Sequence, residues 1–231
     1  LEELDLAGAK NFLPEQSFSG PSSIIKLSLG GYSISGVDFA KFFPILKELS
    51  LNKVENLTLE EIHKVPSSIT KLELEYCNVR GVDFGRLFPN LKTLKVSNCR
   101  GLTADQIQKF PRRLISLELG DCSVRNVNFK EMFPCLQYLR ISSIADFTSA
   151  QIELLPSHLV QLVFSASILS GVCFIGLPSM IARLIFSGVE GLTPEQIEQI
   201  PSEIQVFPKN LSIPSLFIDM FPFTAFATFD A

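Results

Sequence analysis

The sequence predicts an α/β repeat protein in which short strands and short helices alternate along the chain. The first observation is a recurring L-x-x-L-x-L stretch, or a close variant of it, that in most repeats opens shortly after a proline. The second is a helix-start signal in the later part of most repeats. Self-similarity at a fixed period of 20–50 residues is the signature of a repeat architecture. The intervals here alternate between 23 and 22 residues, and the stretch opens at Leu1, Ile24, Leu46, Ile69, Leu91, Leu114, Leu136, Leu159 and Ile181, with a degenerate tenth at Ile204.

Each repeat begins with a predicted strand. In the central repeats we expect these strands over residues 46–51, 69–74, 91–96 and 114–119. Apolar residues alternate with variable ones in each stretch, which is the period-two pattern of a half-buried strand. The leucines are therefore expected to point into a core, and the variable residues between them to the surface.

A short helix is predicted after each strand. Every second repeat has a threonine followed three residues later by Glu or Gln, which is the pattern of a capping box; the pairs are Thr58 and Glu61, Thr103 and Gln106, Thr148 and Gln151, and Thr193 and Gln196. In the other repeats Asp38, Asp83 and Asn128 are expected to cap alone, and Cys173 at that position predicts a weaker helix start. A proline then ends each helix after one or two turns of α- or 3-10 helix.

These repeats resemble the leucine-rich repeat family. Its consensus L-x-x-L-x-L-x-x-N/C-x-L is similar to residues 69–79 and 114–124, and residues 91–103 resemble the cysteine-containing subtype. The proline that precedes most of the L-x-x-L-x-L stretches is also similar to the pattern in repeats of bacterial effectors. Over residues 1–207 the resemblance implies a curved solenoid with a parallel β-sheet on the concave face and short helices on the convex face, followed by a Phe-rich C-terminal cap over 208–231. Where the family has Asn or Cys, irregularity is expected at Val54, Ile144, Ser167 and Val189.

Composition narrows the functional class. A hydrophobic content of 46% is enough for a continuous core, and no apolar run approaches the ~18 residues that a membrane span needs. The net charge of −4 comes from mixed acids and bases, which disfavours nucleic acid as the partner. Five cysteines, three of them at one repeat position, favour a reducing, cytoplasmic compartment over a disulfide framework.

No residue pattern indicates catalysis. Cys77, Cys99 and Cys122 supply one thiol per repeat, whereas zinc needs four ligands with close spacing inside each pair. A nucleophilic cysteine needs a base within reach, and the chain has two histidines, His63 and His158. They lie four repeats apart and are not expected to converge on one site, so no such base is expected. We therefore expect no enzyme activity, no metal and no cofactor.

The variable strand and loop positions are the candidate binding surface. Tyrosine and arginine often dominate interface energy, and interspersed charges favour partner selection. A merely solvated sheet face remains the alternative. The candidate partner-binding residues are Glu73, Glu75, Tyr76, Lys95, Asn98, Glu118, Asp121, Tyr138 and Arg140.

The sequence thus predicts a non-catalytic, monomeric protein–protein interaction module that binds a partner protein on its concave face, with no nucleic acid or membrane partner. By family analogy, the alternative is the substrate-recognition arm of a larger ubiquitin ligase, of the F-box-associated kind, or of a bacterial effector in the host cytosol. The active part would then lie outside these residues. A third possibility is self-assembly through the Phe-rich tail, which otherwise caps the last repeat.

Overall fold

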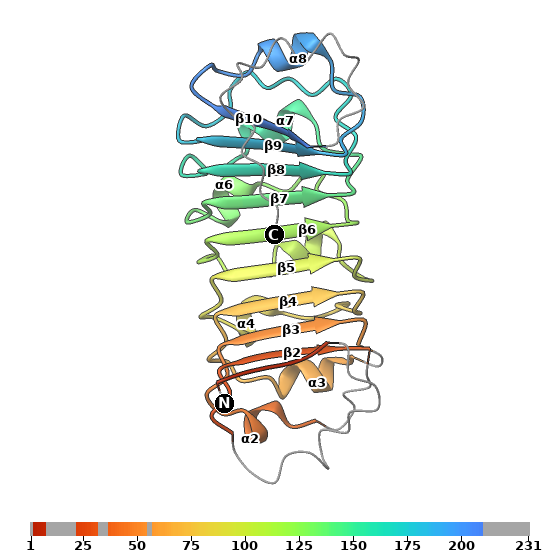
Figure 1. Ribbon diagram of the computed structural model, residues 1–231, viewed down its shortest axis with the longest axis vertical. Helices are drawn as coiled ribbons and strands as arrows, with labels where there is room; N and C mark the ends of the chain where they lie inside the picture. The colour runs from red at the N-terminus through yellow and green to blue at the C-terminus, as the bar shows by residue number, and fades with distance from the viewer. Residues whose placement is uncertain (1, 8–21, 32–36, 55–56, 210–231) are drawn as a thin grey trace. The chain divides into compact units, whose positions relative to one another are not determined.

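The computed structural model describes residues 2–7, 22–31, 37–54 and 57–209 (Figure 1). The chain divides into two compact units, Leu1–Cys122 and Ser123–Ala231. The Phe-rich tail beyond residue 209, for which we predict a cap or a contact site, lies outside the described residues. Within the described residues, no helix combines the length and the apolar character that a bilayer crossing requires.

The first unit contains a sheet of parallel strands that follow one another in chain order. Each strand pairs with the next in register, so that Leu49 of one strand lies opposite Leu72, and Leu72 opposite Leu94. Equivalent leucines therefore stack directly on one another, as the repeat period predicts. The strands are β1 (Glu3–Leu6), β2 (Lys26–Gly30), β3 (Glu48–Asn52), β4 (Lys71–Glu75), β5 (Thr93–Ser97) and β6 (Ser116–Gly120).

Short helices lie behind these strands in Figure 1. They are α2 (Phe39–Phe42), α3 (Leu59–His63), α4 (Phe84–Leu87) and α5 (Ala104–Ile107). The predicted caps at Asp38 and Asp83 are confirmed, because each carboxylate accepts a hydrogen bond from a first-turn amide at 2.9 and 3.0 Å. Thr58 forms the full capping box with Glu61.

The capping box predicted at Thr103 is only half formed. The Thr103 hydroxyl accepts from the amide of Gln106 at 3.3 Å, but the Gln106 side chain turns away and donates to the carbonyl of Val82 in the preceding repeat. The buried carbonyl of Val82 needs a donor, and a glutamine amide can supply one. Gln106 thus contacts the preceding repeat without accepting from the amide of Thr103.

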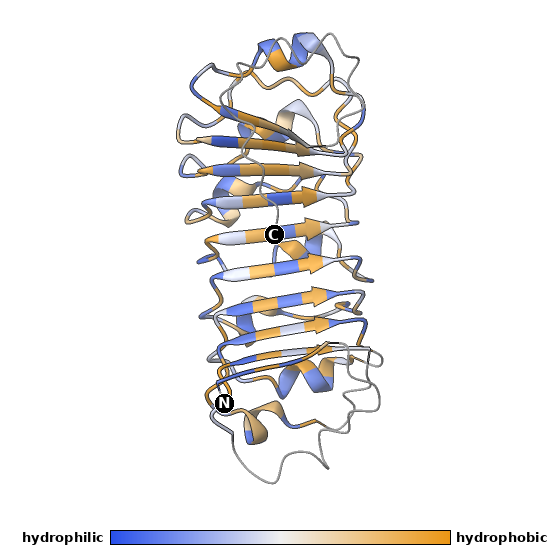
Figure 2. Cartoon of the chain, in the orientation of Figure 1, coloured by the Kyte–Doolittle hydropathy of each residue, from blue (hydrophilic) through white to orange (hydrophobic). Residues whose placement is uncertain are grey.

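The core lies between the sheet and the helices. Leu94 and Leu117, the second residues of β5 and β6, are 0% and 1% exposed. Phe84 of α4 packs edge-on against Phe110 with ring centroids 5.1 Å apart. Hydropathy alternates along β1 to β6 in Figure 2, so each strand of the first unit has one apolar and one polar face. Full burial of each such side chain contributes roughly 1.5–3 kcal/mol.

The second unit repeats this pattern. Its strands are β7 (Tyr138–Ser142), β8 (Gln161–Ser165), β9 (Arg183–Ser187) and β10 (Gln205–Lys209), and its helices are α6 (Phe129–Met132), α7 (Ser149–Glu153) and α8 (Pro194–Glu198). The described repeat that contains Cys173 has no helix between β8 and β9, in agreement with the weak start predicted there. Strand β10 reaches Lys209, two residues beyond the expected end of the repeats.

Ser167, Cys77 and Cys99 occupy the same loop position of their repeats and form different hydrogen bonds there. Ser167, 1% exposed, accepts from the amide of Ile144 at 3.3 Å and donates to the carbonyl of Ser165 at 2.9 Å. The thiols of Cys77 and Cys99 donate to the carbonyls of Leu51 and Leu74 at 3.6 and 3.4 Å. These cysteines therefore have the structural role expected for small buried donors.

Buried amides at the third residue of the capping-box helices link neighbouring repeats. Gln196, 6% exposed, accepts from the amide of Thr193 at 2.8 Å and donates to the carbonyls of Leu169 and Val172 at 2.8 and 2.7 Å. In the first unit Glu61 occupies the same repeat position and is 5% exposed. An ionised carboxylate accepts hydrogen bonds but cannot donate them, so it cannot make the link that a glutamine makes.

We therefore expect Glu61→Gln to raise the free energy of unfolding by about 1 kcal/mol at neutral pH, because it removes a buried charge and adds a donor. Urea denaturation followed by circular dichroism measures the change. The exposed neighbour Glu60→Gln is the control, and its effect should stay below about 0.5 kcal/mol. A clear loss of stability in Glu61→Gln would contradict the proposed donor role of this position.

Candidate functional site on the outer sheet face

The outer sheet face is the side of the first unit's sheet that lies opposite the core. Its side chains come from the first and third residues of each strand. Register places Lys26 beside Glu48 and Glu48 beside Lys71, so charges of opposite sign alternate from strand to strand. A second row continues the alternation over the later strands, through Glu73, Lys95 and Glu118. Opposite charges directly across neighbouring strands stabilise a sheet modestly.

Ion pairs within this face engage its lysines. The Lys26 ammonium lies 3.7 Å from the Glu48 carboxylate, and the Lys95 ammonium lies 3.8 Å from that of Glu118. Lys71 donates to Glu73 at 2.8 Å, and this hydrogen bond raises the pKa of Lys71. The groups are partly exposed, so each pair contributes at most about 1 kcal/mol. Their main effect is that the ammonium groups already have anionic partners.

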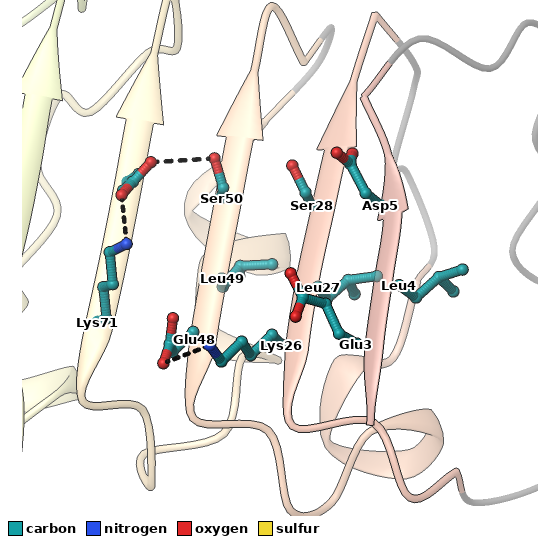
Figure 3. A pocket seen from close by; sticks show the side chains of 11 residues that line it. Glu3, Leu4, Asp5, Lys26, Leu27, Ser28, Glu48, Leu49, Ser50 and Lys71 are labelled. Carbon is teal, nitrogen blue, oxygen red and sulfur yellow. Dashed lines mark hydrogen bonds and ion pairs between the residues drawn. The ribbon is translucent and has the colours of Figure 1, made fainter. Parts of the chain in front are cut away.

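A pocket of about 310 Å³ opens on this face over β1 to β4. Figure 3 shows its lining, with Asp5, Ser28 and Ser50 on successive strands. Its charged side chains are four carboxylates and two ammonium groups, from Glu3, Asp5, Glu48, Glu73, Lys26 and Lys71. Both ammonium groups are held by Glu48 and Glu73.

Glu3 and Asp5 give this pocket its excess negative charge. Among the described residues, neither carboxylate takes part in an ion pair, and Asp5 accepts one hydrogen bond, from the amide of Ala7 at 2.9 Å. Both side chains are exposed. An open polar pocket with two unmatched carboxylates can accept a cationic group, such as the ammonium of lysine or the guanidinium of arginine.

The first unit contains seven of the nine residues predicted to bind a partner. Glu73, Lys95 and Glu118 lie on the outer sheet face itself. Glu75 lies at the end of β4, where it accepts from Asn52 Nδ2 at 3.1 Å. The other three, Tyr76, Asn98 and Asp121, occupy one loop position in successive repeats and share a positive φ of 55°, 52° and 55°.

Tyr76 is an exposed aromatic side chain at the end of β4. Its side chain is 50% exposed, and the Lys53 ammonium lies over its ring at 5.2 Å from the centroid. A left-handed conformation costs a bulky residue roughly 1–2 kcal/mol, whereas Gly or Asn adopts it readily. The same backbone conformation recurs at this loop position in other repeats, at Lys53, Ser143 and Ala166, so it belongs to the turn of the repeat.

Tyr138 and Arg140 belong to the second unit. Both lie on β7 and are exposed, Tyr138 to 43%. The Arg140 guanidinium donates to the Ser165 hydroxyl at 3.1 Å. Conversely, Glu3, Asp5, Lys26 and Glu48 line the pocket but are not among the residues predicted from sequence. The alternation of sign at the first strand position of four successive repeats is the signal that could have indicated them.

Other reactive groups do not gather on this face. Among the described residues, no three of His, Cys, Asp and Glu are grouped so as to hold a metal ion. The neighbouring Cys77 thiol, together with burial, raises the pKa of the Cys99 thiol. His63 is exposed on α3, where its ring contacts the carbonyl of Leu59.

No family model matches the chain, and no curated protein matches it.

Proposed function

We propose that this chain is a non-catalytic protein-binding module of the leucine-rich repeat kind, and that the outer sheet face of its first unit takes a basic segment of a partner protein. The pocket over β1 to β4 is the observation that supports this most directly. Its two lysines are paired within the face, while the carboxylates of Glu3 and Asp5 remain open to an incoming cation. The partner's lysine or arginine side chain enters there.

The extent of the face favours a protein segment over a small molecule. Parallel strands lie about 4.8 Å apart, so the face from β1 to β6 is about 24 Å long. The alternating charges of Glu73, Lys95 and Glu118 continue beyond the pocket and select the partner's charge pattern. Tyr76 at the strand ends adds an amphipathic ring of the type that often dominates binding energy.

The module acts as a monomer, without cofactor, metal, nucleic acid or membrane, in the cytosol. All five cysteines are free thiols, which suits a reducing compartment. Function in this proposal comes from shape and charge pattern alone.

The experiment is a selection of peptides from a random displayed library on the purified chain. We expect enrichment of Lys and Arg in the selected peptides. The double variant Glu3→Gln/Asp5→Asn should weaken their binding by at least about tenfold, which corresponds to ~1.4 kcal/mol. Fluorescence anisotropy with the labelled peptides measures the dissociation constants.

A matched control neutralises two exposed acids away from the pocket, Glu60→Gln/Asp105→Asn, and should change the affinity by less than about twofold, since exposed charges at a distance are screened. Selected peptides without basic residues, or equal weakening by the two double variants, would overturn the proposal.

A further inference from the structure

A second charged surface lies at the edge of the first unit where its strands begin. All strands point the same way, so the turns that lead from each helix into the next strand gather at this edge, to the left in Figure 1. Four of these segments, which begin at the end of α2 and α4 or just after α3 and α5, are residues 41–47, 64–70, 86–92 and 109–115, and they contain no Asp or Glu. Lysine and arginine recur in all four.

We call this surface the basic edge and define it by six exposed cations: Lys41, Lys47, Arg86, Lys92, Lys109 and Arg113. Lys64 belongs to the same turns, but its ammonium is held by Glu60 at 2.9 Å. The equivalent turns at 131–137 and 154–160 of the second unit contain no Lys or Arg. The cations are thus confined to the first unit, although the turn itself recurs.

Backbone hydrogen bonds place these cations on neighbouring repeats. The amide of Thr70 donates to the carbonyl of Lys47 at 2.8 Å, and the amide of Lys92 donates to the carbonyl of Thr70 at 2.8 Å. The turns of three successive repeats are therefore in direct contact. Likewise the amide of Gly85, next to Arg86, donates to the carbonyl of Lys109 at 2.7 Å.

The charges of the basic edge are not neutralised within the described part of the chain. None of the six cations belongs to a salt bridge there. Lys47 makes one long hydrogen bond to the carbonyl of Ser68 at 3.4 Å, and the Lys41 ammonium lies 5.5 Å from the centroid of the Phe42 ring. Exposed like charges in a row raise the local potential and attract anions.

We propose that the basic edge binds an acidic peptide segment of a protein. Four repeats at about 4.8 Å spacing span about 14 Å, which matches four to five residues of an extended peptide at ~3.4 Å each. Carboxylates on such a segment reach the row of cations. The guanidinium group of Arg86 or Arg113 can donate two parallel hydrogen bonds to one carboxylate.

The surroundings favour a peptide over the other polyanions. Nucleic acid single strands bind where aromatic rings interleave with cations, and the described turns expose no aromatic ring, since Phe42 is half-buried and Phe110 buried. Duplex nucleic acid is disfavoured by the net charge of −4. A lipid surface takes inserted apolar groups, and Ile45, at 48%, is the one exposed large apolar side chain of these turns.

The test measures binding of a fluorescein-labelled octaglutamate peptide to the full chain by anisotropy, with an octaserine peptide as the reference. We expect binding of octaglutamate alone, weakening as salt is raised from ~50 mM to ~300 mM because the contact is electrostatic. The charge reversal Lys47→Glu/Lys92→Glu should raise the dissociation constant by at least about tenfold. A second double variant, Lys109→Glu/Arg113→Glu, should raise the dissociation constant by a similar factor. It keeps the proposal testable if the first variant misfolds.

The control Arg80→Glu/Arg100→Glu makes the same change of net charge with exposed arginines that follow strands β4 and β5, at the opposite edge. It should change the dissociation constant by less than about threefold. No binding of octaglutamate, or equal weakening by the control, overturns the proposal. Tighter edge-dependent binding of an oligothymidine or of phosphatidylserine vesicles overturns it as well and assigns the edge to that anion.

Discussion

Replacing Leu94 by alanine is expected to lower the free energy of unfolding by about 2–5 kcal/mol. Leu94, the second residue of β5, is fully buried and lies in register between Leu72 and Leu117. The substitution removes apolar surface and leaves a cavity between neighbouring repeats, which stabilise one another by stacking. Chemical denaturation followed by circular dichroism measures the loss.

The neighbouring residue provides the control for this prediction. Lys95 lies next to Leu94 on the same strand but on the outer sheet face, where its pair with Glu118 is partly exposed. We expect Lys95→Ala to cost less than about 1 kcal/mol. A larger loss in Lys95→Ala than in Leu94→Ala would contradict the register of the whole repeat.

Replacing Gln196 by alanine is expected to lower the free energy of unfolding by about 3 kcal/mol. The side chain makes three hydrogen bonds, and its removal leaves the buried carbonyls of Leu169 and Val172 without this donor. Urea denaturation is again the measurement. The exposed residue Glu198, on the same helix, is the control, because Glu198→Ala removes a similar side chain without touching these carbonyls. Equal effects of the two substitutions would show that the link between repeats contributes nothing.

The register of the fold could be predicted from the sequence because one period assigns nearly every leucine to the core. Leu72, Leu94 and Leu117 are buried and in register as the alternation requires. Three of the four predicted capping boxes are confirmed, at Thr58, Thr148 and Thr193, whereas the one at Thr103 lacks the return bond to Gln106. Gln106 matches the pattern but binds the carbonyl of Val82.

The candidate site could be predicted only in part. The variable positions of the strands do form a charged face, which includes Glu73, Lys95 and Glu118. In the pocket over β1 to β4, the carboxylates of Glu3 and Asp5 remain open because the neighbouring lysines pair with other acids. These ion pairs can be identified only after the strands have been placed side by side. The periodic pattern also gives no sign of the division between Cys122 and Ser123, and Tyr138 and Arg140 lie in the second unit.

Site-specific photocrosslinking tests the proposed function most directly. A photoreactive phenylalanine derivative is placed at Ser50, which lines the pocket, or at Asp105, which is exposed on α5 away from it. With a labelled basic peptide from the selection, we expect a covalent adduct from position 50 and none from position 105. An adduct from position 105 alone would contradict the assignment of the outer sheet face as the binding surface.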